Sequence, residues 1–96
     1  MPDTIRDNEA HHRFELVRDG HLAVAHYRMT PGVITFTHTE VPAELSGKGV
    51  GTALLKGALD MVRRQGLKVV AECPFVSAFI AKRAEYGDLL QEGPKA

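Results

Sequence analysis

The sequence contains a single cysteine, no excess of charge of either sign and no long hydrophobic run. Cys73 cannot form an internal disulfide, and a reducing compartment would keep its thiol free. Twelve basic residues balance twelve acidic ones, so the chain lacks the net positive charge that attracts nucleic acids. No apolar stretch approaches the roughly 20 residues that span a bilayer, and the first residues do not resemble a secretory signal. We therefore expect a cytoplasmic protein that binds neither nucleic acid nor membrane.

The length and composition fit one compact domain. With 96 residues the chain is too short for two cores of ordinary size. Its hydrophobic share of 44% and charged share of 25% are typical of globular proteins. Residues 1–12 and 91–96 are polar and aperiodic, and we expect both ends to be flexible, with docking of part of the first segment on the sheet as the alternative. The histidines and the cysteine do not form a recognised metal-ligand spacing, so no metal is predicted.

The first half of the chain predicts an antiparallel sheet. Residues 13–18 and 21–30 favour β-structure, and the Asp19-Gly20 pair between them suits the positive φ angles of a tight hairpin. Pro31-Gly32 predicts a second turn, after which residues 33–41 are rich in β-branched side chains. Together these segments predict a three-strand meander.

The second half changes to helical spacing. Apolar residues recur at intervals of three and four between about residues 48 and 65, and Gly66 is a good helix stop. Residues 67–72 suit a short buried strand, and Pro74 fits the first turn of a second helix that we expect to end near Gly87. The predicted fold is a mixed α/β sheet. It consists of the meander, a helix, a strand that joins the sheet in parallel, and a second helix.

A glycine-rich segment, Ser46-Gly47-Lys48-Gly49-Val50-Gly51-Thr52, opens the first predicted helix. The first amides of a helix lack carbonyl partners, and the helix dipole adds about half a positive charge there, so this position favours phosphate. Glycines without Cβ atoms let these amides approach an anion closely, and Lys48 adds a mobile positive charge. The segment therefore predicts a site for a diphosphate group.

Two other glycine motifs bind phosphates, and neither fits this segment. A P-loop requires Gly-Lys-Ser/Thr with four residues between its glycines, whereas Lys48 is followed by Gly49 and Thr52 comes too late. A dinucleotide fingerprint requires the spacing G-x-G-x-x-G in a parallel βαβ unit, but the spacing here is G-x-G-x-G after an antiparallel meander. ATP hydrolysis and NAD binding are therefore not predicted.

The order of the elements and three short stretches resemble one known family. The stretches are Gly47-Lys48-Gly49-Val50-Gly51, Cys73-Pro74-Phe75 and Glu85-Tyr86-Gly87-Asp88-Leu89. Together, over residues 13–90, they resemble the GNAT N-acetyltransferases, especially the minimal YjdJ-type members. The resemblance implies a single N-acetyltransferase domain over residues 1–96 that uses acetyl-CoA as its cosubstrate.

The resemblance also implies which residues hold acetyl-CoA. In the family, a Gln or Arg followed after two residues by Gly-x-Gly/Ala binds the diphosphate; Gly49 and Gly51 match this pattern, and Ser46 stands in place of Gln or Arg. Two basic pairs, Arg63-Arg64 and Lys82-Arg83, are expected on solvated helix faces. The alternative is that one of these pairs contacts the CoA 3′-phosphate. In the family, backbone groups of the strand before the turn contact the acetyl carbonyl and pantetheine. The implied cofactor-binding residues are Thr39, Glu40, Val41, Ser46, Gly47, Lys48, Gly49, Val50, Gly51 and Thr52.

Larger GNAT enzymes often place a glutamate base at the position that Thr35 occupies here. Since threonine is not a strong base, four other residues are candidates for a catalytic role. Cys73 is expected at the start of the second helix, where free amides favour a thiolate that accepts the acetyl group; its alternative is a packing role. His38 and Glu40 are expected on one strand face, where either accepts a proton from an amine or simply faces solvent. Tyr86 is the implied acid near the departing sulfur, or a helix anchor.

The sequence therefore predicts acetyl transfer from acetyl-CoA to an amine, either by way of acetylated Cys73 or by direct attack. The helices that wall the acceptor site in larger GNAT enzymes have no room here, and the acceptor is a protein or a small molecule. A second hypothesis, motivated by the absent glutamate base, is a non-catalytic module that binds or senses acyl-CoA. A third is a protein-interaction domain with a vestigial loop. Neither the acceptor nor the oligomeric state follows from the sequence.

Overall fold

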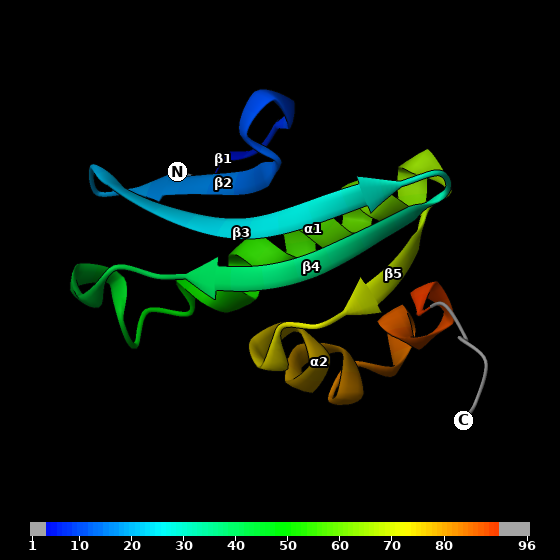
Figure 1. Cartoon of the computed structure of the whole chain (residues 1–96). Helices are drawn as coiled ribbons and strands as arrows, with labels where there is room; N and C mark the ends of the chain where they lie inside the picture. Colours follow the sequence, from blue (N-terminus) through cyan, green and yellow to red (C-terminus); the bar gives the residue numbers. More distant parts are fainter. Residues whose placement is uncertain (1–3, 91–96) are drawn as a thin grey trace.

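A five-stranded sheet forms the centre of the computed structural model, which describes residues 4–90 (Figure 1). Residues 1–3 and 91–96, which belong to the expected flexible ends, lie outside the described residues. The strands follow one another across the sheet in chain order: β1 (Thr4–Asn8), β2 (Arg13–Arg18), β3 (His21–Thr30), β4 (Val33–Glu40) and β5 (Lys68–Ala71). The helices are α1 (Val50–Gln65) and α2 (Pro74–Ala81), with the 3-10 helices η1 (Glu9–His11), η2 (Ala43–Leu45) and η3 (Ala84–Leu89).

The strand directions confirm the predicted mixed sheet. Strands β1 to β4 are antiparallel neighbours, and β5 joins β4 in parallel after the α1 crossover. In the first hairpin turn, Asp19 and Gly20 have φ angles of 54° and 77°, the positive values of a type I′ turn. In the second turn, Gly32 has a φ angle of 74°, as a type II turn after proline requires. Both turns therefore form where the sequence predicts them.

The leader is not flexible along its whole length: β1 pairs with β2 along the edge of the sheet, as the alternative of a docked segment predicts. The Tyr27 hydroxyl donates a hydrogen bond of 2.6 Å to Asp7. Ile5 packs against α1 where Gly57 leaves space, since a Cβ atom at Gly57 would lie 2.5 Å from Ile5 Cγ1. The polar composition hid this strand because its apolar contact with the helix comes from Ile5, which lies between Thr4 and Arg6.

A bulge in β4 changes the alternation of its side chains, so that the residues after the bulge face the opposite side of the sheet from the one that regular alternation would give them. The register between β3 and β4 shifts so that Tyr27 pairs with Phe36 while His26 pairs with His38, which leaves Thr37 as the extra residue. Tyr27 and Phe36 are buried in the core. Because side chains alternate along a strand, His26 and His38 face the opposite side of the sheet.

Glycines flank α1 at both ends. Gly49 and Gly66 each have a φ angle of 73°, a left-handed conformation that glycine adopts without strain. The helix begins at Val50, slightly later than predicted, because Lys48 and Gly49 belong to the preceding turn. Its buried stripe consists of Val50, Leu54, Leu55, Ala58, Leu59 and Val62.

Helix α2 is shorter than predicted. It starts at Pro74, as predicted, but ends at Ala81 rather than near Gly87. Arg83 has an extended backbone that breaks the helix before η3. This change of direction returns η3 to α2 and α1, so that the last described residues close the core.

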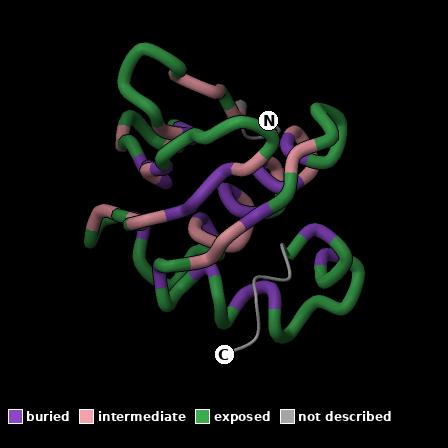
Figure 2. Tube along the Cα trace, turned by 45° about the vertical axis from the view of Figure 1, so that its right-hand side comes forward, coloured by how far each residue is buried: buried purple, intermediate pink, exposed green. Residues whose placement is uncertain are grey.

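One hydrophobic core lies between the sheet and the helices, where the buried segments of Figure 2 meet. Helix α1 lies behind the sheet in Figure 1, and α2 lies at the β5 edge. Over residues 4–90, the sheet face turned toward the viewer in Figure 1 has no helix across it. No helix in that range is long and apolar enough to span a membrane. The described fold is therefore a two-layer structure with one uncovered sheet face.

The substitution Gly57→Ala tests the docking of β1 on α1. Alanine favours a helix over glycine by about 1 kcal/mol, but its Cβ atom would clash with Ile5. We expect a net loss of about 1–2 kcal/mol in the free energy of unfolding, measured by urea denaturation. In an Ile5→Ala background the Cγ1 and Cδ1 atoms are gone and only the Cβ atom of residue 5 remains, 3.1 Å from the added Cβ atom, so the same change is expected to be neutral or to stabilise by up to about 1 kcal/mol. Equal effects in the two backgrounds would contradict the docking.

Candidate functional site

The glycine turn leaves a row of backbone amides free at the start of α1. The first helical hydrogen bond runs from the amide of Ala53 to the carbonyl of Gly49 at 3.0 Å. Within residues 4–90, the amides of Gly49, Val50, Gly51 and Thr52 have no acceptor. Free N–H groups at a helix N-terminus form a site for an anion. The Val50 side chain is buried, so this residue offers only its backbone.

The remaining predicted residues of the turn hold its shape or face solvent. Ser46 donates its amide to Ala43, and its side chain is exposed. Gly47 has a φ angle of 79° and is also exposed. The Lys48 ammonium lies 3.5 Å from an oxygen of Asp19, so the predicted mobile charge is shared with the β2–β3 hairpin.

Strands β4 and β5 separate in the neighbourhood of this turn. Their last paired residues are Phe36 and Ala71, and the carbonyl of Phe36 accepts 3.0 Å hydrogen bonds from the amides of both Glu72 and Cys73. Strand β4 continues to Glu40, and in the described chain this continuation has no strand on its β5 side. Its backbone edge is therefore open to a ligand that carries amide groups.

Phe75 connects the glycine turn with the start of α2. A Cβ atom at Gly51 would lie 2.7 Å from the Phe75 ring and 3.5 Å from Val41, so glycine permits this close approach. The ring is 43% exposed. The glycine turn, the end of β4 and the start of α2 therefore lie next to one another, and the place where these three segments meet is the candidate site.

Thr39 lies next to Cys73 at this place. Thr39 pairs with buried Ala25 and so faces the helix side of the sheet, and its Oγ1 lies 3.5 Å from Cys73 Sγ. Burial raises the pKa of Cys73, but the Thr39 hydroxyl and the backbone amides of Val76 and Phe75 lower it by more, so that the net pKa lies below its ordinary value. Phe75 and Val76 lie in the first turn of α2, so the start of this helix contributes to the lowering.

His38 and Glu40 lie on the uncovered side of the sheet and share one face, as predicted. His38 Nε2 lies 3.0 Å from Glu40 Oε2, and both side chains are 62% exposed. The His26 ring stacks on His38 with centroids 6.1 Å apart. This pair offers a proton acceptor to the open side, while β4 separates it from the thiol of Cys73 on the helix side.

Tyr86 lies apart from this place. Its hydroxyl donates a 2.9 Å hydrogen bond to Asp60 on α1, and its buried ring packs against Phe79. Burial and the hydrogen bond to Asp60 raise the pKa of Tyr86 to about 12. A helix rises about 1.5 Å per residue, which puts Asp60 roughly 15 Å from the start of α1. Of the two predicted roles, the helix anchor has a contact that supports it.

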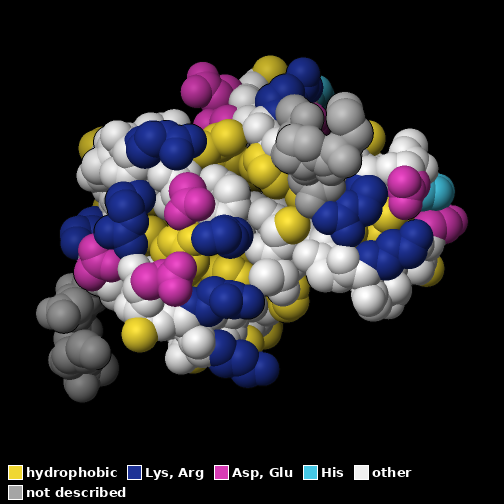
Figure 3. All heavy atoms as spheres, turned by 180° about the vertical axis from the view of Figure 1, so that it is seen from behind, with side chains coloured by type: hydrophobic (Ala, Val, Ile, Leu, Met, Phe, Trp, Pro, Cys, Tyr) yellow, Lys and Arg dark blue, Asp and Glu magenta, His cyan; other side chains and the backbone are white. Residues whose placement is uncertain are grey.

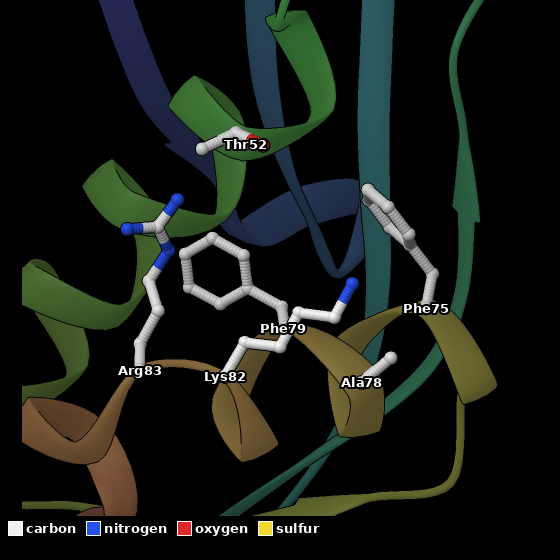
Figure 4. A pocket seen from close by; sticks show the side chains of 6 residues that line it. All are labelled: Thr52, Phe75, Ala78, Phe79, Lys82 and Arg83. Carbon is white, nitrogen blue, oxygen red and sulfur yellow. The ribbon is translucent and has the colours of Figure 1, made fainter.

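A cleft of about 340 Å³ opens between the start of α1 and the residues of α2 (Figure 4). In Figure 4 the Phe79 ring and the Arg83 guanidinium rise toward Thr52 of α1, and the Lys82 side chain extends from the C-cap of α2 toward Phe75. The Arg83 guanidinium lies 4.8 Å from the centre of the Phe79 ring. The cleft therefore combines two aromatic rings with two cations beside the free amides.

The sequence does not predict all of this cleft. The apolar pattern of the second helix places Phe75 and Phe79 on a core face, and Lys82-Arg83 fits either a solvated helix face or a contact with a phosphate group. The signal was present in the spacing, because Phe75, Phe79 and Lys82 follow one another at intervals of four and three, and such residues share one helix face. The side-chain role of Thr39 was also missed, because it depends on a bulge and on a residue far along the chain.

A second cleft, of about 380 Å³, lies near the other end of α1. It is lined by Asp7, Glu9, His12, Tyr27, Met29 and Gln65. It contains none of the residues that the sequence predicts for the site. In the part of the chain that the structure describes, no three His, Cys, Asp or Glu side chains are grouped so as to hold a metal ion.

The substitution Thr39→Val is expected to raise the pKa of Cys73. Valine has a similar shape but cannot hydrogen bond to sulfur, so the thiolate loses a stabilising partner. An ultraviolet titration of the thiolate measures the pKa directly, because Cys73 is the single cysteine. The matched control is Thr35→Val in the same strand, which should leave the pKa unchanged. An unchanged or lower pKa in Thr39→Val would argue against the contact.

The chain is similar to a known family and to a solved structure. A family model described as GCN5-related N-acetyl-transferase matches residues 13–89. The solution structure of a "GCN5-like putative N-acetyltransferase" from Staphylococcus aureus is similar, with a TM-score of 0.72 and 32% identity over 95% of this chain and 90% of that chain. No curated protein matches. The YjdJ-type subfamily stays a prediction. The predicted family is confirmed, and the chain belongs to the GCN5-related N-acetyltransferase family.

Proposed function

We propose that this protein transfers the acetyl group of acetyl-CoA to an amine. One observation carries the proposal: the free amides at the start of α1, the open edge of β4 and the Cys73 thiol surround one place. These three features suit three parts of acetyl-CoA, namely the diphosphate, the pantetheine amides and the thioester. Membership of the GCN5-related family supports the same activity.

Each part of the cofactor then has a set of residues to hold it. The amides of residues 49–52 bind the diphosphate. The pantetheine lies along the backbone of residues 39–41 like an added strand. Lys82 and Arg83 in the cleft supply charge for the 3′-phosphate. Figure 3 views the α1 side of the molecule, where Lys and Arg side chains are more prominent than acidic ones, which suits a polyanionic ligand.

Cys73 is the nucleophile in the route that the contacts favour. Its thiolate attacks the thioester carbon; a bond forms between that carbon and Cys73 Sγ, the bond to the CoA sulfur breaks, and the CoA thiolate takes a proton from water. The acceptor amine next attacks the acetyl-Cys73 carbon, so that a C–N bond forms, the Cys73 thiolate is released and a base takes the amine proton. The contact with Thr39 and the lowered pKa of Cys73 support the first step.

The acceptor approaches from the uncovered face of the sheet. Helices α1 and α2 close the helix side, whereas the open side carries the exposed pair of His38 and Glu40 beside the place where β4 and β5 separate. This pair is the base that takes the proton of the amine. Because no helix covers this face in residues 4–90, it admits an amine on a protein as well as one on a small polyamine-like molecule.

Calorimetric titration with acetyl-CoA, followed by intact mass measurement, tests the proposal. We expect binding, and an added acetyl group that is absent in Cys73→Ala. With an amine and peptide panel, Cys73→Ala should lose at least about tenfold in kcat, as typical for removal of a covalent nucleophile. Full activity of Cys73→Ala would leave direct attack as the route. Binding without any acetylation would favour the non-catalytic acyl-CoA module, and no binding would refute the proposed function.

The double variant Lys82→Met/Arg83→Met tests the cleft. Methionine keeps much of the side-chain length but removes the charge, and we expect the affinity for CoA to fall by about tenfold. Dephospho-CoA, which lacks the 3′-phosphate, is the matched ligand control, and its affinity should be the same for the wild-type and variant proteins. Equal losses for both ligands would mean that these cations act on the diphosphate or on folding instead.

A further inference from the structure

We infer that the β2–β3 hairpin turn is part of the diphosphate site, and that Arg18 and Asp19 change cofactor affinity in opposite directions. The inference rests on the proposed function. Both are positioning residues, because they act through the glycine turn.

Two contacts join the hairpin to the middle of the glycine turn. Arg18 Nη1 donates a 3.0 Å hydrogen bond to the carbonyl of Lys48. Asp19 Oδ2 lies 3.5 Å from Lys48 Nζ. The hairpin thus holds both the backbone and the side chain of the one residue that separates Gly47 from Gly49.

The Arg18 contact orients the first free amide of the site. A trans peptide is planar, and the described chain contains no cis peptide, so the Lys48 carbonyl and the Gly49 N–H point in opposite directions. With the carbonyl directed at Arg18, the Gly49 N–H is directed away from the hairpin and stays available to an anion. Without this contact the Lys48–Gly49 peptide, whose second residue is a glycine, rotates more freely, and it presents its carbonyl oxygen, which repels phosphate, for part of the time.

Asp19 acts in the other direction. Its carboxylate places a negative charge beside an anion site and occupies the Lys48 ammonium, although both side chains are largely exposed, at 65% and 50%. Exposed ion pairs are weak, so a bound diphosphate competes for Lys48. Removal of the Asp19 charge therefore frees Lys48 for the cofactor.

Calorimetric titration of the full chain with CoA tests the opposite signs. Arg18→Met, which loses both charge and donor, is expected to bind about tenfold more weakly. Arg18→Lys keeps the charge and a donor and should stay within about threefold of the wild type. Asp19→Asn is expected to bind about two- to threefold more tightly, and its Asn-Gly sequence preserves the type I′ turn. The control is Arg64→Met, an exposed arginine at the other end of α1, which should bind like the wild type.

An amide NMR spectrum of the CoA-free protein supplies a second readout. Arg18→Met is expected to shift the Gly49 amide resonance, whereas Arg64→Met leaves it in place. The inference is overturned if Arg18→Met binds like Arg64→Met, or if Arg18→Met and Asp19→Asn weaken binding equally, as a purely structural hairpin would. If the wild type binds CoA and Arg18→Met binds it with the same affinity, only this inference is overturned. If the wild type binds no CoA, the proposed function is overturned and this inference with it.

Discussion

The carbonyl of Phe36 accepts hydrogen bonds from the amides of both Glu72 and Cys73, and beyond it β4 and β5 are no longer paired. Strand β4 nevertheless continues to Glu40. This leaves a strand edge whose backbone groups still require partners, directly beside the start of α2. The candidate site depends on this separation, because it creates an opening in an otherwise continuous sheet.

The parallel pairing of β4 and β5 places two helix starts near that opening. Parallel strands end at the same edge of a sheet, and each of these two strands is followed by a helix. The positive ends of α1 and α2 therefore lie near each other, as the contact between Gly51 and Phe75 shows. One positive end has free amides for an anion, and the other lowers the pKa of Cys73. In the proposed function, this topology serves two parts of one ligand.

The bulge at Thr37 distributes reactive groups over both sides of β4. Without it, His38 would follow Ile34 and Phe36 into the core, because alternate residues share a face. With it, Thr39 turns to Cys73 on the helix side, while His38 and Glu40 face the uncovered side. Because of this one extra residue, the Cys73 thiol and the pair of His38 and Glu40 lie on opposite faces of the sheet. In the proposed function, the thioester and the amine approach from these two different sides.

The sequence by itself determined the hairpin turns, the apolar stripe of α1 and the glycine turn before it. Their signals are local, because a positive φ angle, a helical period and a helix start each depend on residues close together in the chain. Only the tertiary structure revealed β1, which depends on Ile5 meeting Gly57, and the bulge at Thr37.

The contacts that build the candidate site also depend on the tertiary structure. Thr39 meets Cys73, and Arg18 meets Lys48, across about thirty residues of chain. No local propensity encodes such pairs, because they form only when the sheet register and the crossover helix bring distant segments together. The sequence therefore determined which chemical groups are present, and the tertiary structure decided which of them lie within reach of one another.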